Sequence, residues 1–127
     1  MLIGVECNGE VRGIMAVRRT PSPSRLDSGH VIYVDYLESA PWNLKGIVVS
    51  PRFLGVGTVL MGEAVRLSME EKLGGRVGLH SLPQAEPFYS KIGMTRVGVD
   101  ESYYDLPYFE YTSQQASDWL TSVGGLT

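Results

Sequence analysis

The run Arg52-Phe53-Leu54-Gly55-Val56-Gly57-Thr58 constrains the fold more than any other part of the chain. It fits the spacing Arg/Gln-x-x-Gly-x-Gly/Ala, and a helical pattern begins inside it. Glycines at this spacing let the backbone approach a ligand closely and leave several N–H groups pointing one way. The positive end of the helix dipole adds to their effect. The run therefore predicts a phosphate or pyrophosphate site at the start of a helix, or, on the simpler interpretation, only a turn.

The residues after this loop predict an amphipathic helix. One apolar stripe runs along it, made of Val56, Leu60, Ala64 and Leu67. Gly74-Gly75 is expected to end the helix, since glycine is the usual residue just past a helix C-terminus.

The first forty residues predict an antiparallel start to a sheet. A strand over 2–7 and another over 11–18 flank the turn signal Asn8-Gly9, and a third, rich in Val, Ile and Tyr, is expected over 31–37. The Pro- and Ser-rich segment 20–29 between them is expected to be a mobile loop. Pro41 breaks the pattern over 39–46, and 47–49 is either a short strand or an extended approach to the glycine loop.

The second half of the chain predicts further alternation of strands and helices. We expect a strand over 76–82, a helix from Pro83 to Gly93, strands over 94–99 and 107–112, and a terminal helix from Ser113. The order is β-β-β-α-β-α-β-β-α, which indicates a mixed α/β (α+β) fold with one sheet flanked by helices. A chain of 127 residues is long enough for one domain, so we expect a single domain over 1–127.

A second motif lies about thirty residues after the first. The segment from Gly78 to Met94 resembles the pattern Ala-x-x-Phe-Tyr-x-x-x-Gly-Phe/Met of the GNAT superfamily of acyl-CoA-dependent N-acyltransferases. The positions that fall on the pattern are Ala85, Phe88, Tyr89, Gly93 and Met94. The resemblance covers about residues 31 to 112. The chain departs from it at its start, because the hairpin stands where the family usually has a strand and two helices that cover the acceptor site.

The resemblance implies a mainly antiparallel sheet whose two central strands splay apart and hold acetyl-CoA between them. It implies that the loop–helix junction holds the pyrophosphate, so that this would be an acyl-CoA-binding domain. The cofactor-binding residues expected from it are Val49, Arg52, Phe53, Leu54, Gly55, Val56, Gly57, Thr58, Ser81 and Tyr89. The family's asparagine three residues before the alanine is Leu82 here, so that contact must come from elsewhere, such as Ser81.

Acyl transfer to an amine also needs an acid, a base and a donor for the developing oxyanion. The resemblance implies that Tyr89 protonates the departing thiolate; the alternative is that it only packs. Asp35 and Glu38 are the expected bases, or they bind substrate, and Glu110 is a third choice. His80 has a suitable ordinary pKa, although a lone strand histidine is more often structural. The resemblance places an oxyanion-binding N–H at a strand bulge that the sequence does not locate.

The remaining expectations concern the acceptor and the surroundings. Tyr36 and Trp42 are expected to bind substrate, or to pack, and the same ambiguity holds for Tyr33. The net charge of −3 shows no basic stripe, so we expect no nucleic-acid partner, and no metal site is expected. A single cysteine, Cys7, and the absence of a long apolar run predict a cytoplasmic protein without a membrane partner. Exposed sheet edges make a homodimer plausible.

Two functions therefore follow from the sequence. The first is an acetyl-CoA-dependent N-acetyltransferase that acts on an amine of a small molecule or protein, with the acceptor undetermined. The second is a CoA-binding module without catalysis that regulates or joins a complex. Tyr89 and the strand carboxylates favour the enzyme.

Overall fold

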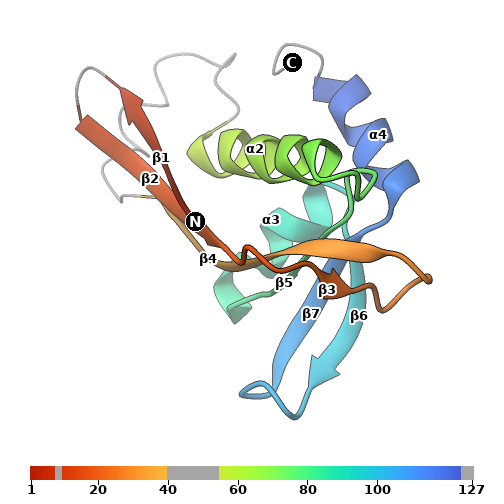
Figure 1. The fold of residues 1–127 in the computed structure, drawn as a ribbon. Helices are drawn as coiled ribbons and strands as arrows, with labels where there is room; N and C mark the ends of the chain where they lie inside the picture. The colour runs from red at the N-terminus through yellow and green to blue at the C-terminus, as the bar shows by residue number, and fades with distance from the viewer. Residues whose placement is uncertain (8–9, 40–54, 124–127) are drawn as a thin grey trace.

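The computed structural model describes residues 1–7, 10–39 and 55–123. The described chain forms one seven-stranded sheet with strand order β1-β2-β4-β5-β7-β6, to which β3 adds by pairing with β4 (Figure 1). The strands are β1 (Leu2–Cys7), β2 (Glu10–Val17), β3 (Ser22–Pro23), β4 (His30–Ser39), β5 (Val77–His80), β6 (Thr95–Asp100) and β7 (Leu106–Tyr111). The helices are α2 (Val56–Glu70), the 3₁₀ turn η1 (Pro83–Ala85), α3 (Glu86–Lys91) and α4 (Ser113–Val123). The mixed, mainly antiparallel architecture and the predicted order of the main elements are confirmed.

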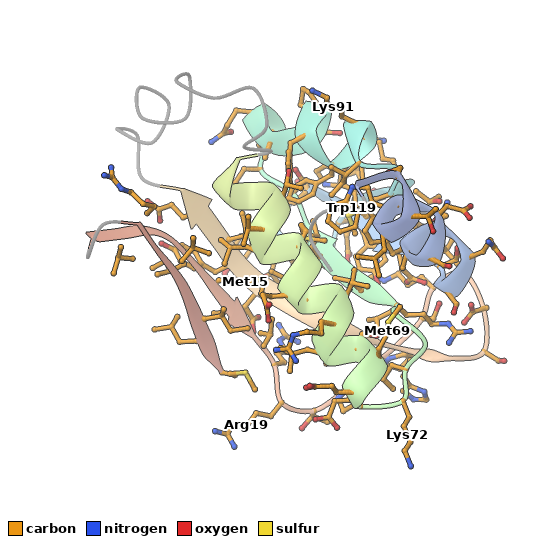
Figure 2. The ribbon with its side chains drawn as sticks, turned by 90° about the horizontal axis from the view of Figure 1, so that it is seen from above. Met15, Arg19, Met69, Lys72, Lys91 and Trp119 are labelled. Atoms are coloured by element: carbon orange, nitrogen blue, oxygen red, sulfur yellow. The ribbon has the colours of Figure 1, made fainter. Side chains whose placement is uncertain are left out.

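The three α-helices of the described residues lie on one face of the sheet. Figure 2, seen from above, shows α2 crossing the sheet with α3 and α4 beside it. Their apolar residues share one core with alternate residues of the central strands. The core members that the strands supply include Ile32 and Val34, Val77 and Leu79, and Phe109 and Tyr111. We call this the helix face and the opposite side the outer face of the sheet.

β4 and β5 form the one parallel pair of the described sheet, and they pair only briefly. Ile32, Tyr33 and Val34 lie opposite Val77, Gly78 and Leu79. β4 then continues to Ser39 while β5 ends at His80. The two central strands therefore part after Val34 and Leu79, as the resemblance to the GNAT superfamily implied.

A bulge in β4 lies at the point where the strands part. Ala16 and Val17 are consecutive in β2, yet their partners are Tyr36 and Val34, so Asp35 is an extra residue in β4. The extra residue shifts the alternation of the strand. Ile32 and Val34 belong to the core before the bulge, but after it Leu37 packs against the core. Tyr36 and Glu38 therefore lie on the outer face, with Tyr33.

Two local expectations differ from the structure. The segment predicted as a loop over 20–29 contains β3, whose Ser22 and Pro23 pair with Val31 and His30. The helix predicted to stop at Gly74-Gly75 already ends at Glu70, because Lys72 adopts a positive φ of 63°. Lys72 N–H donates to the Met69 carbonyl (3.0 Å) and Leu73 N–H to the Ser68 carbonyl (2.8 Å). This pair of bonds is a Schellman motif with lysine in the position that glycine usually takes.

Other expectations from the sequence can also be compared with the structure. β1 and β2 pair antiparallel up to Cys7 and Glu10, as predicted for the hairpin, while its turn signal Asn8-Gly9 lies outside the described residues. The possible strand at 47–49 lies outside the described residues. No helix among the described residues combines the length and the apolar character that a membrane crossing requires.

Candidate functional site

A cleft opens where β4 and β5 part. It has a volume of about 520 Å³. Its walls come from β4, the end of β5, the turn before α3, α3 itself and the β6–β7 connection; the lining residues are Val34, Asp35, Tyr36, Leu37, Glu38, Leu79, His80, Leu82, Gln84, Ala85, Tyr89, Tyr103 and Leu106. Of the predicted site residues, Asp35, Tyr36, Glu38 and Tyr89 meet here. The cleft thus joins carboxylates and phenols from elements far apart in the sequence.

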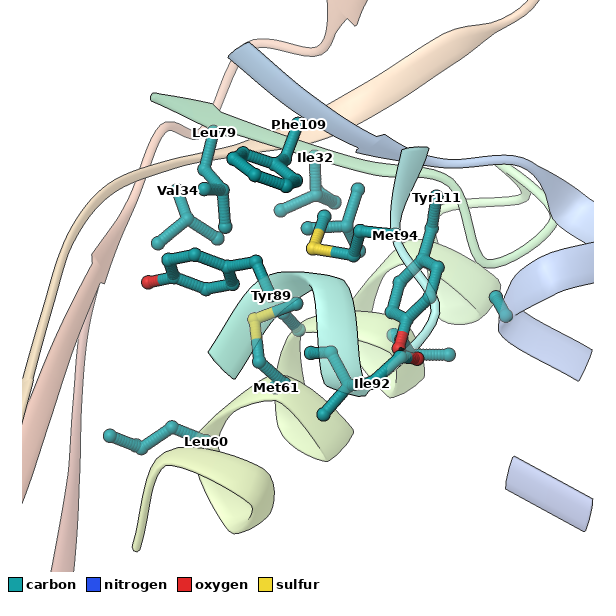
Figure 3. Close-up of a cluster of buried hydrophobic side chains, with 14 of the residues drawn as sticks. Ile32, Val34, Leu60, Met61, Leu79, Tyr89, Ile92, Met94, Phe109 and Tyr111 are labelled. Atoms are coloured by element: carbon teal, nitrogen blue, oxygen red, sulfur yellow. Dashed lines mark hydrogen bonds between the residues drawn. The ribbon is translucent and has the colours of Figure 1, made fainter. Parts of the chain in front are cut away.

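Tyr89 contributes a phenol from the helix face. Its side chain comes from α3 and is 6% exposed, with the ring packed beside Phe88 and Phe109. In Figure 3 the hydroxyl points away from Met94 and Tyr111, while the ring lies beside Val34. Burial raises the pKa of this phenol to about 12. Tyr89 is therefore held protonated at neutral pH at the wall of the cleft.

Gly55 and Gly57, the two glycines of the first motif, lie at the start of α2, and Gly57 meets the second motif in space. Gly55 has a φ of 93°, a conformation that favours glycine. A Cβ on Gly57 would lie 3.1 Å from Cζ of Phe88, so the missing side chain lets α2 pack closely on α3. The start of α2 has no side-chain cap and no acidic residue in its first turn. The N–H groups there, including that of the buried Thr58, are thus suited to an anion.

The predicted bases differ in their surroundings. Asp35 forms an ion pair with Arg18, with 2.8 Å between Oδ1 and Nε. Glu38 accepts a hydrogen bond from the Tyr36 hydroxyl, and both side chains are exposed on the cleft. Glu38 therefore keeps one oxygen that no described bond uses, whereas Asp35 is held by a cation.

The other predicted residues do not join this group. Ser81 is 1% exposed, donates its hydroxyl to the Leu82 carbonyl at 2.7 Å, and does not line the cleft. Glu110 is fully buried on the outer face, where it accepts hydrogen bonds from the Ser24 hydroxyl, the Arg25 N–H and the Tyr108 hydroxyl. The remaining ones lie outside the described residues: Trp42, Val49, Arg52, Phe53 and Leu54. The Val56 side chain is also outside what the structure describes.

Sequence reasoning missed a polar cluster on the outer face. The Tyr33 hydroxyl lies 2.5 Å from His80 Nδ1, and His80 Nε2 lies 2.8 Å from Asp100 Oδ2. Tyr103, in the β6–β7 connection, stacks on the His80 ring with 4.1 Å between centroids. The four residues come from three strands and a turn, so no local motif could have grouped them. Within the described residues, no group of His, Cys, Asp and Glu could hold a metal ion.

Solved structures share this arrangement. No protein-family model matches the chain, and no curated protein matches it either. A mutant of the toxin AtaT, bound to the C-terminus of its antitoxin AtaR and acetyl-CoA, superposes with a TM-score of 0.61 at 16% identity, over 87% of this chain and 64% of that one. The N-acetyltransferase YlbP of Bacillus subtilis, in complex with coenzyme A, gives 0.58 at 14% identity, over 87% and 66%. A GNAT-family acetyltransferase of Listeria monocytogenes gives 0.54 at 14% identity, over 81% and 58%.

The chain has the GNAT fold. The two central strands part as the resemblance in sequence implied, and Gly55 lies at the N-terminus of α2. The chain spans less than two thirds of the length of each of these three structures. At such low identity the likeness concerns the fold, and the activity has to be argued from the chain's own residues.

Proposed function

We propose that this protein is an acetyl-CoA-dependent N-acetyltransferase that transfers the acetyl group to an amine by direct attack on the thioester. The observation that carries the proposal is the cleft between β4 and β5, with the Tyr89 phenol on one wall and the carboxylates of β4 on the other. Two solved structures with the same fold hold acetyl-CoA or coenzyme A. Acetyl-CoA supplies the activated acyl group, and this chain's residues would bind it, orient it and move protons.

The start of α2 is the proposed pyrophosphate site. Gly55, Gly57 and Thr58 present backbone N–H groups at the uncapped end of a fifteen-residue helix. Arg52, Phe53 and Leu54, which complete the motif, are proposed to take part with them, and so is Val49. The chemistry of these donors fits a phosphate group, because uncapped N–H groups and the helix dipole both favour negative charge.

The bulge at Asp35 is the proposed place for the thioester carbonyl. It lies where β4 leaves β5, so the backbone there is no longer committed to the parallel partner. The GNAT resemblance implies a backbone N–H at such a bulge, which would stabilise negative charge on the carbonyl oxygen. A preorganised donor of this kind typically lowers the activation free energy by about 3–4 kcal/mol.

Tyr89 is the proposed acid for the leaving thiolate. A thiolate has a pKa of about 8.5 in water. A phenol with a pKa of about 12 would be a weak donor to it. A thiolate formed in the same low-dielectric cleft is more basic than in water, because burial penalises its charge as well. Burial thus raises the pKa of the departing thiol as well as that of the Tyr89 phenol, so proton transfer between them remains feasible.

Glu38 is the better placed of the two predicted bases, and Tyr36 is proposed to contact the acceptor beside it. Asp35 is engaged in an ion pair with Arg18, whereas the described bond of Glu38 is the one that it accepts from the Tyr36 hydroxyl. The experiment that tests cofactor binding is titration calorimetry of the native protein with acetyl-CoA and with S-acetylpantetheine, which lacks the diphosphate. Tight binding of acetyl-CoA and much weaker binding of the shorter thioester are expected. If neither thioester binds, the proposal is refuted.

Tyr89→Phe separates the enzyme from a module that only binds CoA. The variant keeps the packed ring, so acetyl-CoA affinity is expected to stay unchanged while kcat falls by about 10²–10⁴-fold, the usual contribution of an acid–base group. The matched control is Tyr104→Phe, in which an 85%-exposed ring loses only its hydroxyl. Binding without turnover in the native protein, across a panel of alkylamines, polyamines and amino-acid esters, would favour the non-catalytic alternative.

A further inference from the structure

The cleft has walls on both faces of the sheet. On the helix face it is lined by Val34, Leu79 and Tyr89, which all belong to the core (Figure 3). The start of α2, with Gly55, lies on this face as well, so a thioester anchored there would enter the cleft from the helix face. The outer face is then the side from which a second substrate can approach.

Three side chains line the cleft on its outer side and are accessible there. Tyr36 and Glu38 project from β4 after the bulge, and both are exposed. Tyr103, half-buried, comes from the β6–β7 connection and stacks on the outer-face ring of His80 at 4.1 Å. We call Tyr36, Glu38 and Tyr103 the outer subsite. It offers two phenol rings and one carboxylate to whatever enters from this side.

The connection that carries Tyr103 is strained and tied down. Tyr104 and Asp105 both have a positive φ, 54° and 55°, which residues with a Cβ rarely adopt. Hairpin turns with two such residues usually contain Asn-Gly or Asp-Gly. Leu106 N–H donates to the Tyr103 carbonyl at 3.0 Å, and Tyr103 N–H donates to the Asp100 carbonyl at 3.0 Å. Strain of this kind is kept at functional positions, and this turn fixes Tyr103 at the cleft.

The charge on the walls of the cleft has one sign. Among the described residues that line it, Asp35 and Glu38 are carboxylates and none is a lysine or arginine. Arg18 pairs with Asp35 at 2.8 Å, whereas the described bond of Glu38 comes from a neutral hydroxyl. An uncompensated carboxylate beside phenol rings attracts an ammonium ion and repels a second carboxylate.

We propose that the outer subsite selects alkylammonium acceptors, that is, amines with no carboxylate on the carbon that bears the nitrogen, and that Tyr103 determines this specificity together with Glu38. The inference rests on the acetyltransferase activity proposed above and names the substrate class of the same site. The ammonium group lies beside Glu38 and the alkyl chain lies against the rings of Tyr36 and Tyr103. An α-amino acid is disfavoured because its own carboxylate comes close to Glu38.

The first test measures cation binding without acetyl-CoA. Choline and 3,3-dimethylbutan-1-ol have the same shape, but only choline is charged, and neither has a nitrogen that can be acetylated. In ¹⁵N-resolved NMR titrations, choline is expected to shift the amide signals of Tyr36, Glu38 and Tyr103 saturably, and the alcohol is not. Glu38→Gln should weaken choline binding by about 3-fold or more, the scale of an accessible ion pair. The matched control is Glu101→Gln, an exposed carboxylate that does not line the cleft.

The second test compares two acceptors in the acetylation reaction. The probes are L-norleucine and 2-aminohexane of the same configuration, in which a methyl group replaces the carboxylate. Both are ammonium ions at neutral pH, so both need the same deprotonation. The native protein is expected to prefer 2-aminohexane by about tenfold or more in kcat/KM, and Glu38→Gln should reduce this ratio to within about threefold. The ratio cancels any loss of Glu38 as a base, because that loss affects both probes.

The part of Tyr103 is read from KM. Tyr103→Leu is expected to raise KM for 2-aminohexane about 3–5-fold with little change in kcat, because the ring contacts the cation and not the thioester. Tyr103→Phe keeps the ring and should behave as the native protein does. Tyr104→Leu is the matched control, since it removes the neighbouring ring of the same turn, which does not line the cleft. An equal rise of KM in Tyr104→Leu would overturn the role of Tyr103.

The outcomes separate the acceptor class from the activity on which it rests. Equal binding of choline and the neutral alcohol, or equal acetylation of the two amines, would overturn the inference and leave the acetyltransferase proposal standing. Saturable choline binding in a protein that neither binds acetyl-CoA nor acetylates an amine would end the acetyltransferase proposal and leave a cation subsite. The NMR spectrum of each variant shows whether the fold is retained.

Discussion

The surroundings of Glu110 do not suit the role of catalytic base for which the sequence offered it. The sequence offers it as a base, but the structure buries its carboxylate completely and surrounds it with three donors. Arg25 N–H and the Tyr108 hydroxyl bind one oxygen at 2.9 and 2.8 Å, and the Ser24 hydroxyl binds the other. A carboxylate with this many donors fixes the 24–25 segment against the outer face. We therefore treat Glu110 as structural.

Glu110→Gln is expected to destabilise the protein by about 1–3 kcal/mol, because an NH₂ group would replace an acceptor that buried donors need. Urea denaturation measures the loss, and hydrogen exchange at the Arg25 amide should become faster as the segment loosens. Glu101→Gln, an exposed carboxylate in the β6–β7 connection, is the control and should stay within about 0.5 kcal/mol of the native protein. An unchanged Arg25 amide would contradict this account of Glu110.

At the scale of elements, the C-terminus of α2 carries a lysine where glycine is preferred. Lys72 has a φ of 63° and closes the Schellman motif. A left-handed conformation costs a residue with a Cβ about 1–2 kcal/mol, part of which glycine loses again as entropy in the unfolded chain. Lys72→Gly is therefore expected to stabilise the protein by about 0.5–1 kcal/mol in thermal or urea denaturation.

The matched control is Lys91→Gly at the end of α3. Lys91 is exposed as well, but its backbone is helical, so the same replacement should destabilise by up to about 1 kcal/mol. Opposite signs for the two lysines would confirm that φ decides the effect. A loss of stability in both variants would mean that the Lys72 side chain contributes more than the strain costs.

The elements also show how far sequence patterns extend. Apolar periodicity and turn residues are local, and they predicted β1, β2, β4, α2 and the elements after them. The bulge at Asp35 is set by pairing with β2 and has no local signal, yet it places Tyr36 and Glu38 on the outer face beside Tyr33. Simple alternation would separate Tyr33 from Tyr36. The sequence could thus predict which residues of β4 contribute to the site, but it could not predict on which face of the sheet each side chain lies.

The polar cluster of Tyr33, His80 and Asp100 illustrates the same limit across longer distances. Its members are far apart in sequence and belong to strands that the topology brings together only through the order β4-β5-β7-β6. A lone histidine in a strand sequence gives no indication that it will form a hydrogen bond with a carboxylate twenty residues further along. The Gly57–Phe88 contact is the opposite case, because the two GNAT motifs that contain these residues are recognisable separately and then prove to pack on each other.

At the scale of the whole molecule, the buried phenols determine the response to alkaline pH. Burial is the main cause that raises the pKa of Tyr33, Tyr89, Tyr108 and Tyr111 above the ordinary value. These four rings lie on both faces of the sheet, Tyr33 and Tyr108 on the outer face and the other two on the helix face. Each prefers the neutral form more strongly in the folded state than in the unfolded one.

The folded protein should therefore lose stability as the pH rises above about 10, where the phenols of the unfolded chain begin to lose their protons. Below that pH both states are protonated and the stability is fully present. For Tyr89 the loss continues until about pH 12, its folded pKa. Each phenol that is ionised in the unfolded chain but still protonated in the folded protein lowers the free energy of unfolding by about 1.4 kcal/mol per pH unit. Urea denaturation between pH 8 and 12 measures the slope, and Tyr89→Phe should remove one phenol's share of it. A free energy of unfolding that stays constant to pH 12 would show that these hydroxyls reach water.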